Sequence, residues 1–222
     1  MIKIAGVDEA GRGPLIGDLF MALVVINKSV EETLRNLGVR DSKKLTRKKR
    51  EELFNRIISI AEAIVIARIT PVDIDKENIN DLEIKTLCRI LAKAYSTIKF
   101  DKIYVDAFAN PNKIVGHLQK CLREPQIDVV AVYNADSAYT IVGAASIVAK
   151  VLRDRHIDTL RQVYGDFGSG YPSDKRTIDW LKNYYQNHKA IPSIVRKSWK
   201  TVENILGVSS TLDRYTIKKS EE

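Results

Sequence analysis

IKIAGVDEAGRGPLIGDLFMALVVI, the sequence of residues 2–26, contains two apolar runs separated by a glycine-rich segment. The runs at residues 2–7 and 19–26 are rich in Ile, Val and Leu, which is typical of β-strands. The segment 10–17 holds three glycines and a proline, which favour a turn. We therefore predict two strands joined by a tight connection, with Asp8 and Glu9 at the end of the first.

The rest of the chain alternates between strand-like and helix-like apolar patterns. Further strands are predicted at residues 63–69, 103–105 and 129–132. Helices are predicted at residues 46–60, 81–96, 112–122, 139–164, 174–186 and 202–206. This alternation favours an α/β fold and predicts that the C-terminal third is helical.

Length and composition restrict the class of protein. With 222 residues and 45% hydrophobic content, the chain can bury one substantial core and a small additional region. It has no apolar run long enough to span a membrane and begins without the features of a secretion signal, so we expect a soluble, cytoplasmic protein. Cys88 and Cys121 lack metal-ligand spacing, and we expect free buried thiols rather than a zinc site or a disulfide.

The chain is basic, with 36 Lys and Arg against 28 Asp and Glu and a formal net charge of +8. Many of the cations lie in two stretches, one with Arg40, Lys43, Lys44, Arg47, Lys48, Lys49 and Arg50, the other with Arg196, Lys197 and Lys200. This distribution favours a polyanionic partner such as nucleic acid, because cations neutralise phosphates and release counterions. Charge alone does not separate this interpretation from a surface made soluble by lysine.

Acidic residues stand where three predicted strands stop: Asp8 and Glu9, Asp106, and Asp136. Neighbouring strand residues point to opposite faces, so Asp8 and Glu9 serve one site only if the chain bends after them, which glycine at position 11 allows. Each aspartate alone could instead be a helix cap or a turn residue. Four converging carboxylates without His or Cys would select Mg²⁺ or Mn²⁺, and two such ions about 4 Å apart commonly serve phosphodiester cleavage.

Five blocks of the sequence form an ordered set: Val7-Asp8-Glu9-Ala10-Gly11-Arg12-Gly13-Pro14, Asp41-Ser42-Lys43-Lys44-Leu45, Tyr104-Val105-Asp106, Ala135-Asp136 with residues 144–151 (AASIVAKV), and Gly168-Ser169-Gly170-Tyr171-Pro172-Ser173-Asp174. Together they resemble the type 2 ribonuclease H family. The blocks span roughly residues 1–200 and agree in order, which makes the combination specific. The chain departs from the family at Asn134, where members often have lysine.

The resemblance implies an RNase H-like mixed five-stranded sheet flanked by helices, with a helical C-terminal subdomain. It places a catalytic core at residues 1–172, a helical region at 173–207 and a flexible tail at 208–222. It further implies a monomeric endonuclease that hydrolyses the RNA strand of RNA–DNA hybrids and cuts 5′ of ribonucleotides embedded in DNA. Two ions, Mg²⁺ or Mn²⁺, would be shared by Asp8, with Glu9 and Asp106 completing one ligand set and Asp136 the other.

Substrate-binding residues are also expected. Backbone amides of Gly11, Arg12 and Gly13 can approach a ribose closely and sense its 2′-hydroxyl, although these glycines could simply make a tight turn. The resemblance implies that Tyr171 stacks on the deoxyribose at an RNA-to-DNA junction; the alternative is an ordinary half-buried loop tyrosine. Lys43 and Arg12 are the predicted phosphate contacts.

The C-terminal tail resembles the short motif that binds the ring-shaped sliding clamp. Leu212 supplies the aliphatic residue and Tyr215 an aromatic residue three positions later, so one turn of helix would place both on one face. The match is incomplete, because Ser209 stands where Gln is usual and Thr216 where a second aromatic is common. The alternative is that both anchors fold back onto the protein.

Two other functions remain open on the sequence. Another nuclease or a strand-transfer enzyme could use the same carboxylates, but it would cut all-DNA duplexes. A non-catalytic nucleic-acid-binding protein would explain the charge, but it would show no magnesium-dependent cleavage.

Overall fold

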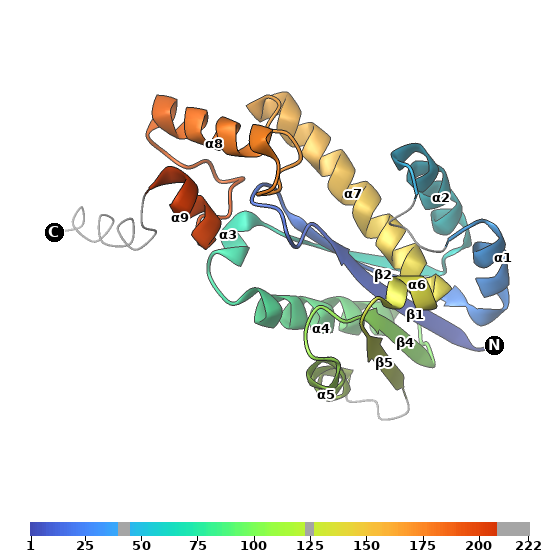
Figure 1. The fold of residues 1–222 in the computed structure, drawn as a ribbon. Coiled ribbons are helices and arrows are strands. Elements are labelled where there is room, and N and C mark those ends of the chain that lie inside the picture. Colours follow the sequence, from blue (N-terminus) through green and yellow to red (C-terminus); the bar gives the residue numbers. More distant parts are fainter. Residues whose placement is uncertain (40–44, 123–126, 208–222) are drawn as a thin grey trace. The chain divides into compact units, whose positions relative to one another are not determined.

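The computed structural model describes residues 1–39, 45–122 and 127–207 of the chain (Figure 1). The chain forms two compact units, each built from separated segments. Unit 1 comprises Met1–Ala10, Leu19–Arg68 and Ile79–Asp154; unit 2 comprises Gly11–Asp18, Ile69–Asn78 and the described residues from Arg155 onward. These units do not coincide with the predicted catalytic core at residues 1–172 and helical region at 173–207. The predicted domain boundaries after residues 172 and 207 stay predictions.

A mixed five-stranded sheet forms the centre of unit 1, as predicted. Its strands are β1 (Lys3–Ala10), β2 (Leu19–Asn27), β3 (Ala63–Ile69), β4 (Lys102–Asp106) and β5 (Asp128–Val132), in the spatial order β3-β2-β1-β4-β5. β1 pairs antiparallel with β2 and parallel with β4, and β4 pairs parallel with β5. The carboxyl ends of β1, β4 and β5 therefore meet at one edge of the sheet.

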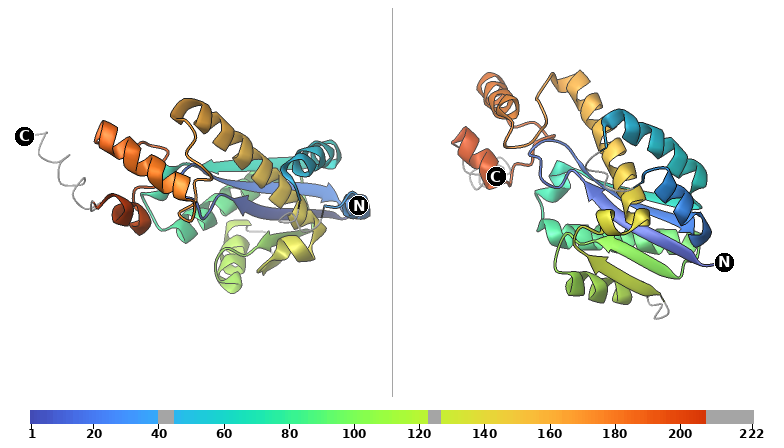
Figure 2. Two further views of the ribbon diagram at one scale, coloured as in Figure 1. Left: turned by 45° about the horizontal axis from the view of Figure 1, so that its top comes forward. Right: turned by 45° about the vertical axis from the view of Figure 1, so that its right-hand side comes forward.

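Helices cover both faces of this sheet. The described helices are η1 (Lys28–Val30), α1 (Glu31–Asn36), α2 (Arg47–Ile60), α3 (Pro71–Ile74), α4 (Ile79–Thr97), α5 (Pro111–Leu122), α6 (Ala135–Ala138), α7 (Thr140–Tyr164), α8 (Lys175–His188) and α9 (Lys200–Leu206). Within unit 1, α2 and the first part of α7 lie on one face, and α4 and α5 lie on the other (Figures 1 and 2). In the described part of the chain, no helix combines the length and apolarity required to cross a membrane.

The helices begin where local chemistry favours it. The Thr46 side chain accepts a hydrogen bond from the Lys49 amide and caps the N-terminus of α2. Thr70 and Asp73 form a reciprocal capping box at the start of α3. The sequence patterns did not predict α3, because a helix of four residues is too short to show a helical period.

The contact between β1 and α7 is close because β1 has glycine at position 6. A Cβ atom on Gly6 would lie 2.4 Å from the carbonyl oxygen of Ile141 and 2.8 Å from the amide nitrogen of Val142. Around it, Ile4 and Val24 of the sheet are buried with Ile57 of α2 and Val148 of α7 in one core. Only a residue without a side chain allows this backbone-to-backbone approach.

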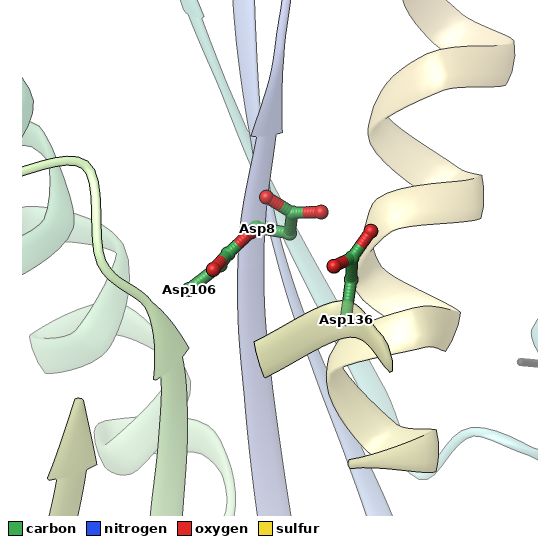
Figure 3. Close-up of side chains that lie close together, drawn as sticks. All are labelled: Asp8, Asp106 and Asp136. Carbon is green, nitrogen blue, oxygen red and sulfur yellow. The ribbon is translucent and has the colours of Figure 1, made fainter. Parts of the chain in front are cut away.

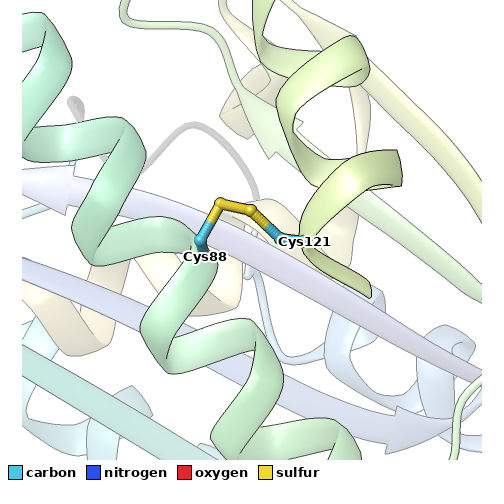
Figure 4. The surroundings of a disulfide bond; sticks show 2 residues. All are labelled: Cys88 and Cys121. Atoms are coloured by element: carbon cyan, nitrogen blue, oxygen red, sulfur yellow. A yellow bond between two sulfur atoms is a disulfide. The ribbon is translucent and has the colours of Figure 1, made fainter. Parts of the chain in front are cut away.

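Cys88 of α4 and Cys121 of α5 form a disulfide bond, with their Cα atoms 5.7 Å apart (Figure 4). The prediction of free thiols was therefore wrong. The two helices pack against each other and bring together residues separated by 33 positions in the sequence. The spacing of cysteines in the sequence could not predict this bond, because it depends on the packing of α4 against α5.

Unit 2 has an apolar core of its own, formed by Leu15, Ile16, Ile157, Phe167, Leu181, Ile194, Val195 and Val202. Backbone hydrogen bonds link the segment 11–18 to the loop before α8. The Leu15 and Ile16 amides both donate to the carbonyl of Gly170, at 2.7 and 3.3 Å. At the start of α8, the carboxylate of Asp174 accepts hydrogen bonds from the amides of Ser169 and Arg176. The connection between β1 and β2 is thus held against the loop that precedes α8.

Replacing Gly6 by alanine tests the close contact in unit 1. We expect Gly6→Ala to lower the free energy of unfolding by about 3 kcal/mol, because the helix backbone must move to admit the methyl group. In a thermal melt, a loss of this size lowers the midpoint by roughly 6–12 °C.

Gly116→Ala is the matched control, since Gly116 lies in α5 and a Cβ added there would point into open space. This change should stabilise the protein by roughly 0.5–1 kcal/mol through helix propensity. Equal melting temperatures for Gly6→Ala and the unmodified protein would show that the contact between β1 and α7 is not tight.

Candidate metal centre

Three aspartates of unit 1 converge at the edge of the sheet where β1 and β4 end (Figure 3). Each of Asp8, Asp106 and Asp136 offers a carboxylate oxygen, and these oxygens all lie within 4.8 Å of one another. Asp8 and Asp136 are 5% and 1% exposed, so two of the carboxylates have little contact with water. Of the four carboxylates expected at the strand ends, these three lie together, and their role as metal ligands stays a prediction.

The sheet register explains why these side chains meet. Val7 of β1 lies beside Val105 of β4, so the next residues, Asp8 and Asp106, share one face of neighbouring parallel strands. Asp136 follows β5 in the short helix α6, which begins after Asn134 in the left-handed conformation with φ 56°. Asparagine tolerates this left-handed conformation better than most residues do.

Hydrogen bonds hold two of the carboxylates in place. The Asp106 carboxylate accepts a hydrogen bond of 2.9 Å from the amide of Ala135, which ties the end of β4 to the start of α6. The Ser137 hydroxyl lies 3.4 Å from a carboxylate oxygen of Asp136. The loop after β5 therefore orients Asp106 and carries Asp136.

Glu9 does not belong to this group of three among the described residues. β1 continues its regular pairing with β2 through Ala10, so the strand does not bend after Asp8, and Glu9 follows the alternation to the other face. Its side chain is partly buried, and its amide donates a 2.7 Å hydrogen bond to Asp8. Its role as a metal ligand stays a prediction.

Crowding and burial perturb the acidity of the central carboxylate. Burial, together with the nearby negative charge of Asp106, raises the pKa of Asp8 to about 7, against the lowering effect of a hydrogen bond from Ser146. The amide of Glu9 and the charge of Lys150 also lower this pKa but do not offset burial. A divalent cation would relieve the repulsion, and a buried set of oxygen ligands suits a hard ion such as Mg²⁺ or Mn²⁺.

Ser146 and Lys150 are site residues that the sequence patterns did not identify as functional. The ammonium of Lys150 donates a 3.0 Å hydrogen bond to the Ser146 hydroxyl, one turn earlier on α7. Ser146 in turn hydrogen-bonds to Asp8. The only signal for them was their position in the block 144–151 that resembles the family, since serine and lysine in a helix carry no chemical pattern by themselves.

Of the predicted substrate-binding residues, four lie in unit 2. Gly11, Arg12 and Gly13 form the first part of the connection after β1, and a Cβ on Gly13 would lie 3.3 Å from the ring of Tyr171. The Tyr171 side chain is 38% exposed and so is available to a ligand. Lys43, Leu212 and Tyr215 lie outside the described residues, and their predicted roles are untested.

One cation of the predicted basic stretches is not on the surface. Arg196 is fully buried, whereas Lys197 and Lys200 are exposed. Arg196 therefore cannot contribute to a basic surface as its two neighbours can, because clustering of charge in the sequence does not indicate burial.

Comparison with known proteins gives consistent matches. The model of the family described as Ribonuclease HII matches residues 5–202. A ribonuclease HII of Sulfurisphaera tokodaii is 44% identical over 91% of this chain and 95% of its own length. The crystal structure of ribonuclease H2 from Pyrococcus horikoshii superposes with a TM-score of 0.86 at 45% identity, covering 93% of this chain and 98% of that one. A structure of the PCNA:RNase HII complex from Archaeoglobus fulgidus gives a TM-score of 0.81 at 39% identity, covering 95% and 99%.

The raised pKa of Asp8 predicts how stability depends on pH. In the metal-free protein the folded state keeps the Asp8 proton up to about pH 7, whereas the unfolded chain releases it near the ordinary aspartate pKa of 3.8. The free energy of unfolding therefore falls as pH rises between these values. With chelator present at pH 8.5, we expect Asp8→Asn to be more stable than the unmodified protein by roughly 4 kcal/mol at most, since one pKa unit is about 1.4 kcal/mol.

At pH 5 the advantage should shrink to roughly 2 kcal/mol, because the folded wild type is then protonated at Asp8. Asp179→Asn makes the same change at an exposed position of α8 and should leave stability nearly unchanged at both values. Thermal melts at the two pH values measure the difference. A variant less stable than wild type at pH 8.5 would contradict the electrostatic account of the site.

Proposed function

Because the chain belongs to the ribonuclease HII family, we propose that it cuts the RNA strand of RNA–DNA hybrids and also cuts 5′ of single ribonucleotides embedded in duplex DNA. The family is one of endonucleases acting on RNA paired with DNA, and the single-ribonucleotide activity is the finer part of the proposal. The main support for the proposed nuclease activity is the convergence of Asp8, Asp106 and Asp136, because a buried carboxylate cluster suits metal-assisted phosphodiester hydrolysis. The products would carry 3′-hydroxyl and 5′-phosphate ends.

The cofactor in this proposal is Mg²⁺ or Mn²⁺, with two ions in the substrate complex. Bound divalent ions supply the Lewis acidity that activates a water molecule and neutralises charge on the leaving oxygen. Asp8 would be shared between the two ligand sets, with Glu9 and Asp106 in one and Asp136 in the other. Ser146 and Lys150 hold Asp8 through hydrogen bonding and charge, which favours its ionised, ligating form.

Recognition of ribose is assigned to residues of unit 2. The amides of Gly11, Arg12 and Gly13 would read the 2′-hydroxyl, and Tyr171 would stack on the neighbouring deoxyribose at the junction. The close approach of Gly13 to the Tyr171 ring supports a joint role, because it places both recognition elements beside each other within one unit. Arg12 and Lys43 would contact phosphates.

A labelled DNA duplex with one ribonucleotide tests the proposed activity. We expect magnesium-dependent cutting on the 5′ side of the ribonucleotide, no cutting with chelator and no cutting of the matched all-DNA duplex. Asp136→Asn should lower turnover by about three orders of magnitude, because a loss of several kcal/mol of charge stabilisation at the reacting phosphate has that effect.

Asp179→Asn, the exposed aspartate of α8, is the control and should cut at the wild-type rate. Cutting of the all-DNA duplex would favour a different nuclease, and tight binding without cutting would favour a non-catalytic binding protein. Near wild-type turnover by Asp136→Asn would disprove the metal assignment.

The proposal extends to a protein partner. The solved complex of the Archaeoglobus fulgidus relative contains PCNA, and the tail of this chain has Leu212 and Tyr215 at clamp-motif spacing. We expect the monomeric enzyme to bind the ring-shaped sliding clamp through these two anchors, weakly because the motif is incomplete.

Deleting residues from Ser209 onward should abolish clamp binding in a calorimetric titration. Hydrolysis of free oligonucleotides and the melting temperature should stay unchanged, because the deleted residues would act only as a docking motif. The double substitution Leu212→Ala and Tyr215→Ala should have the same effect as the deletion. A drop of several degrees in melting temperature on deletion would instead favour a tail that packs onto the protein.

A further inference from the structure

Arg196 of unit 2 is a fully buried arginine in the loop between α8 and α9. Its guanidinium donates hydrogen bonds to three backbone carbonyls of the connection that follows β1. One Nη donates to Arg12 at 2.7 Å, and the other donates to Gly11 and, at 3.0 Å, to Gly17. A buried guanidinium therefore binds the segment to which the 2′-hydroxyl contact is assigned.

These hydrogen bonds fix the direction of the neighbouring amides. In a planar trans peptide the carbonyl of one residue and the N–H of the next point in opposite directions. Because the carbonyls of Gly11 and Arg12 are turned toward the guanidinium, the N–H groups of Arg12 and Gly13 are turned away from it. Gly11 has φ 90°, a conformation that suits glycine and lets the chain present both carbonyls to one side.

The loop that carries Arg196 is itself held in place. The Asp75 carboxylate accepts hydrogen bonds from the amides of Lys197 and Ser198, at 3.0 and 2.9 Å, and from the Ser198 hydroxyl at 2.7 Å. The Arg196 amide donates to the carbonyl of Leu15 at 2.9 Å, and its guanidinium lies 5.1 Å from the centre of the Trp199 ring. Arg196 is thus anchored through its backbone as well as its side chain.

Only an arginine can make this set of contacts. Its planar guanidinium presents five donors in a fixed fork, so that two nitrogens reach three carbonyls at once. A lysine would retain the charge but would direct its donors from a single nitrogen atom. The requirement for three carbonyls therefore separates the geometric role of Arg196 from its charge.

We propose that Arg196 is a positioning residue that holds the Arg12 and Gly13 amides in the orientation that reads the ribose 2′-hydroxyl. The inference rests on the proposed function and extends it, because it assigns the selectivity for ribose to a side chain that does not touch the substrate. Asp75 supports the same role by fixing the loop of Arg196.

Binding measurements with Arg196→Lys test this role. We would measure affinity for a duplex with one ribonucleotide and for the matched all-DNA duplex, with calcium replacing magnesium to prevent turnover. The wild type should prefer the ribonucleotide duplex by about tenfold, the value of one or two hydrogen bonds. Arg196→Lys should bring this ratio close to one while leaving the affinity for all-DNA duplex unchanged.

Turnover with magnesium should fall by about 100-fold in Arg196→Lys, mainly in kcat, because misplacing a bound substrate slows the chemical step. A merely structural role would lower the fraction of active enzyme and reduce both affinities in parallel. Arg56→Lys, the same change at an exposed position of α2, should retain the wild-type ratio and turnover. Asp75→Asn is a second test of the same role, which remains available if Arg196→Lys fails to fold. Its preference for the ribonucleotide duplex over the all-DNA duplex should also fall.

The outcomes separate the two levels of the proposal. A wild-type protein with no preference for the ribonucleotide duplex would contradict ribose sensing itself. A wild-type preference that survives unchanged in folded Arg196→Lys, or in Asp75→Asn where the lysine variant does not fold, would overturn the role of Arg196.

Discussion

The contact between β1 and α7 at Gly6 is the constraint on which the arrangement of unit 1 depends. Because the helix backbone lies against the strand there, the following turns of α7 pass over the strand end that carries Asp8. Ser146 can then hydrogen-bond to Asp8, and Lys150 can add its positive charge. A larger residue at position 6 would displace the helix and with it the groups that keep a buried carboxylate ionisable.

Much of the fold followed from local pattern. The five strands were found within a few residues of their bounds, because runs of β-branched residues between turn signals are a strong indication. The meeting of Asp8, Asp106 and Asp136 was also predictable, since parallel strands end at one sheet edge. The short helices α1, α3 and α6 were missed because four to six residues are too few to show a helical period.

What local pattern could not supply were contacts between residues far apart in the chain. Ser146 reaches Asp8 from a helix more than a hundred residues later, and Cys88 meets Cys121 only because α4 packs against α5. Arg196 looked like one of several surface cations, yet its partners are the carbonyls of Gly11, Arg12 and Gly17. Each of these depends on tertiary packing, which leaves no trace in spacing or composition.

The alternation of the chain between its two units limits how such a protein can be divided. Unit 2 takes short segments at 11–18 and 69–78 as well as the residues after 154, so neither unit corresponds to one continuous stretch of sequence. A fragment ending at Asp154 would keep the first two segments of unit 2 without the remainder of its core. Neither unit can therefore be exchanged by a single fusion or truncation of the chain. The residues assigned to metal binding lie in unit 1 and those assigned to ribose recognition lie in unit 2. Because the segments of the two units alternate along the chain, the two sets of residues cannot be separated onto different proteins by one cut.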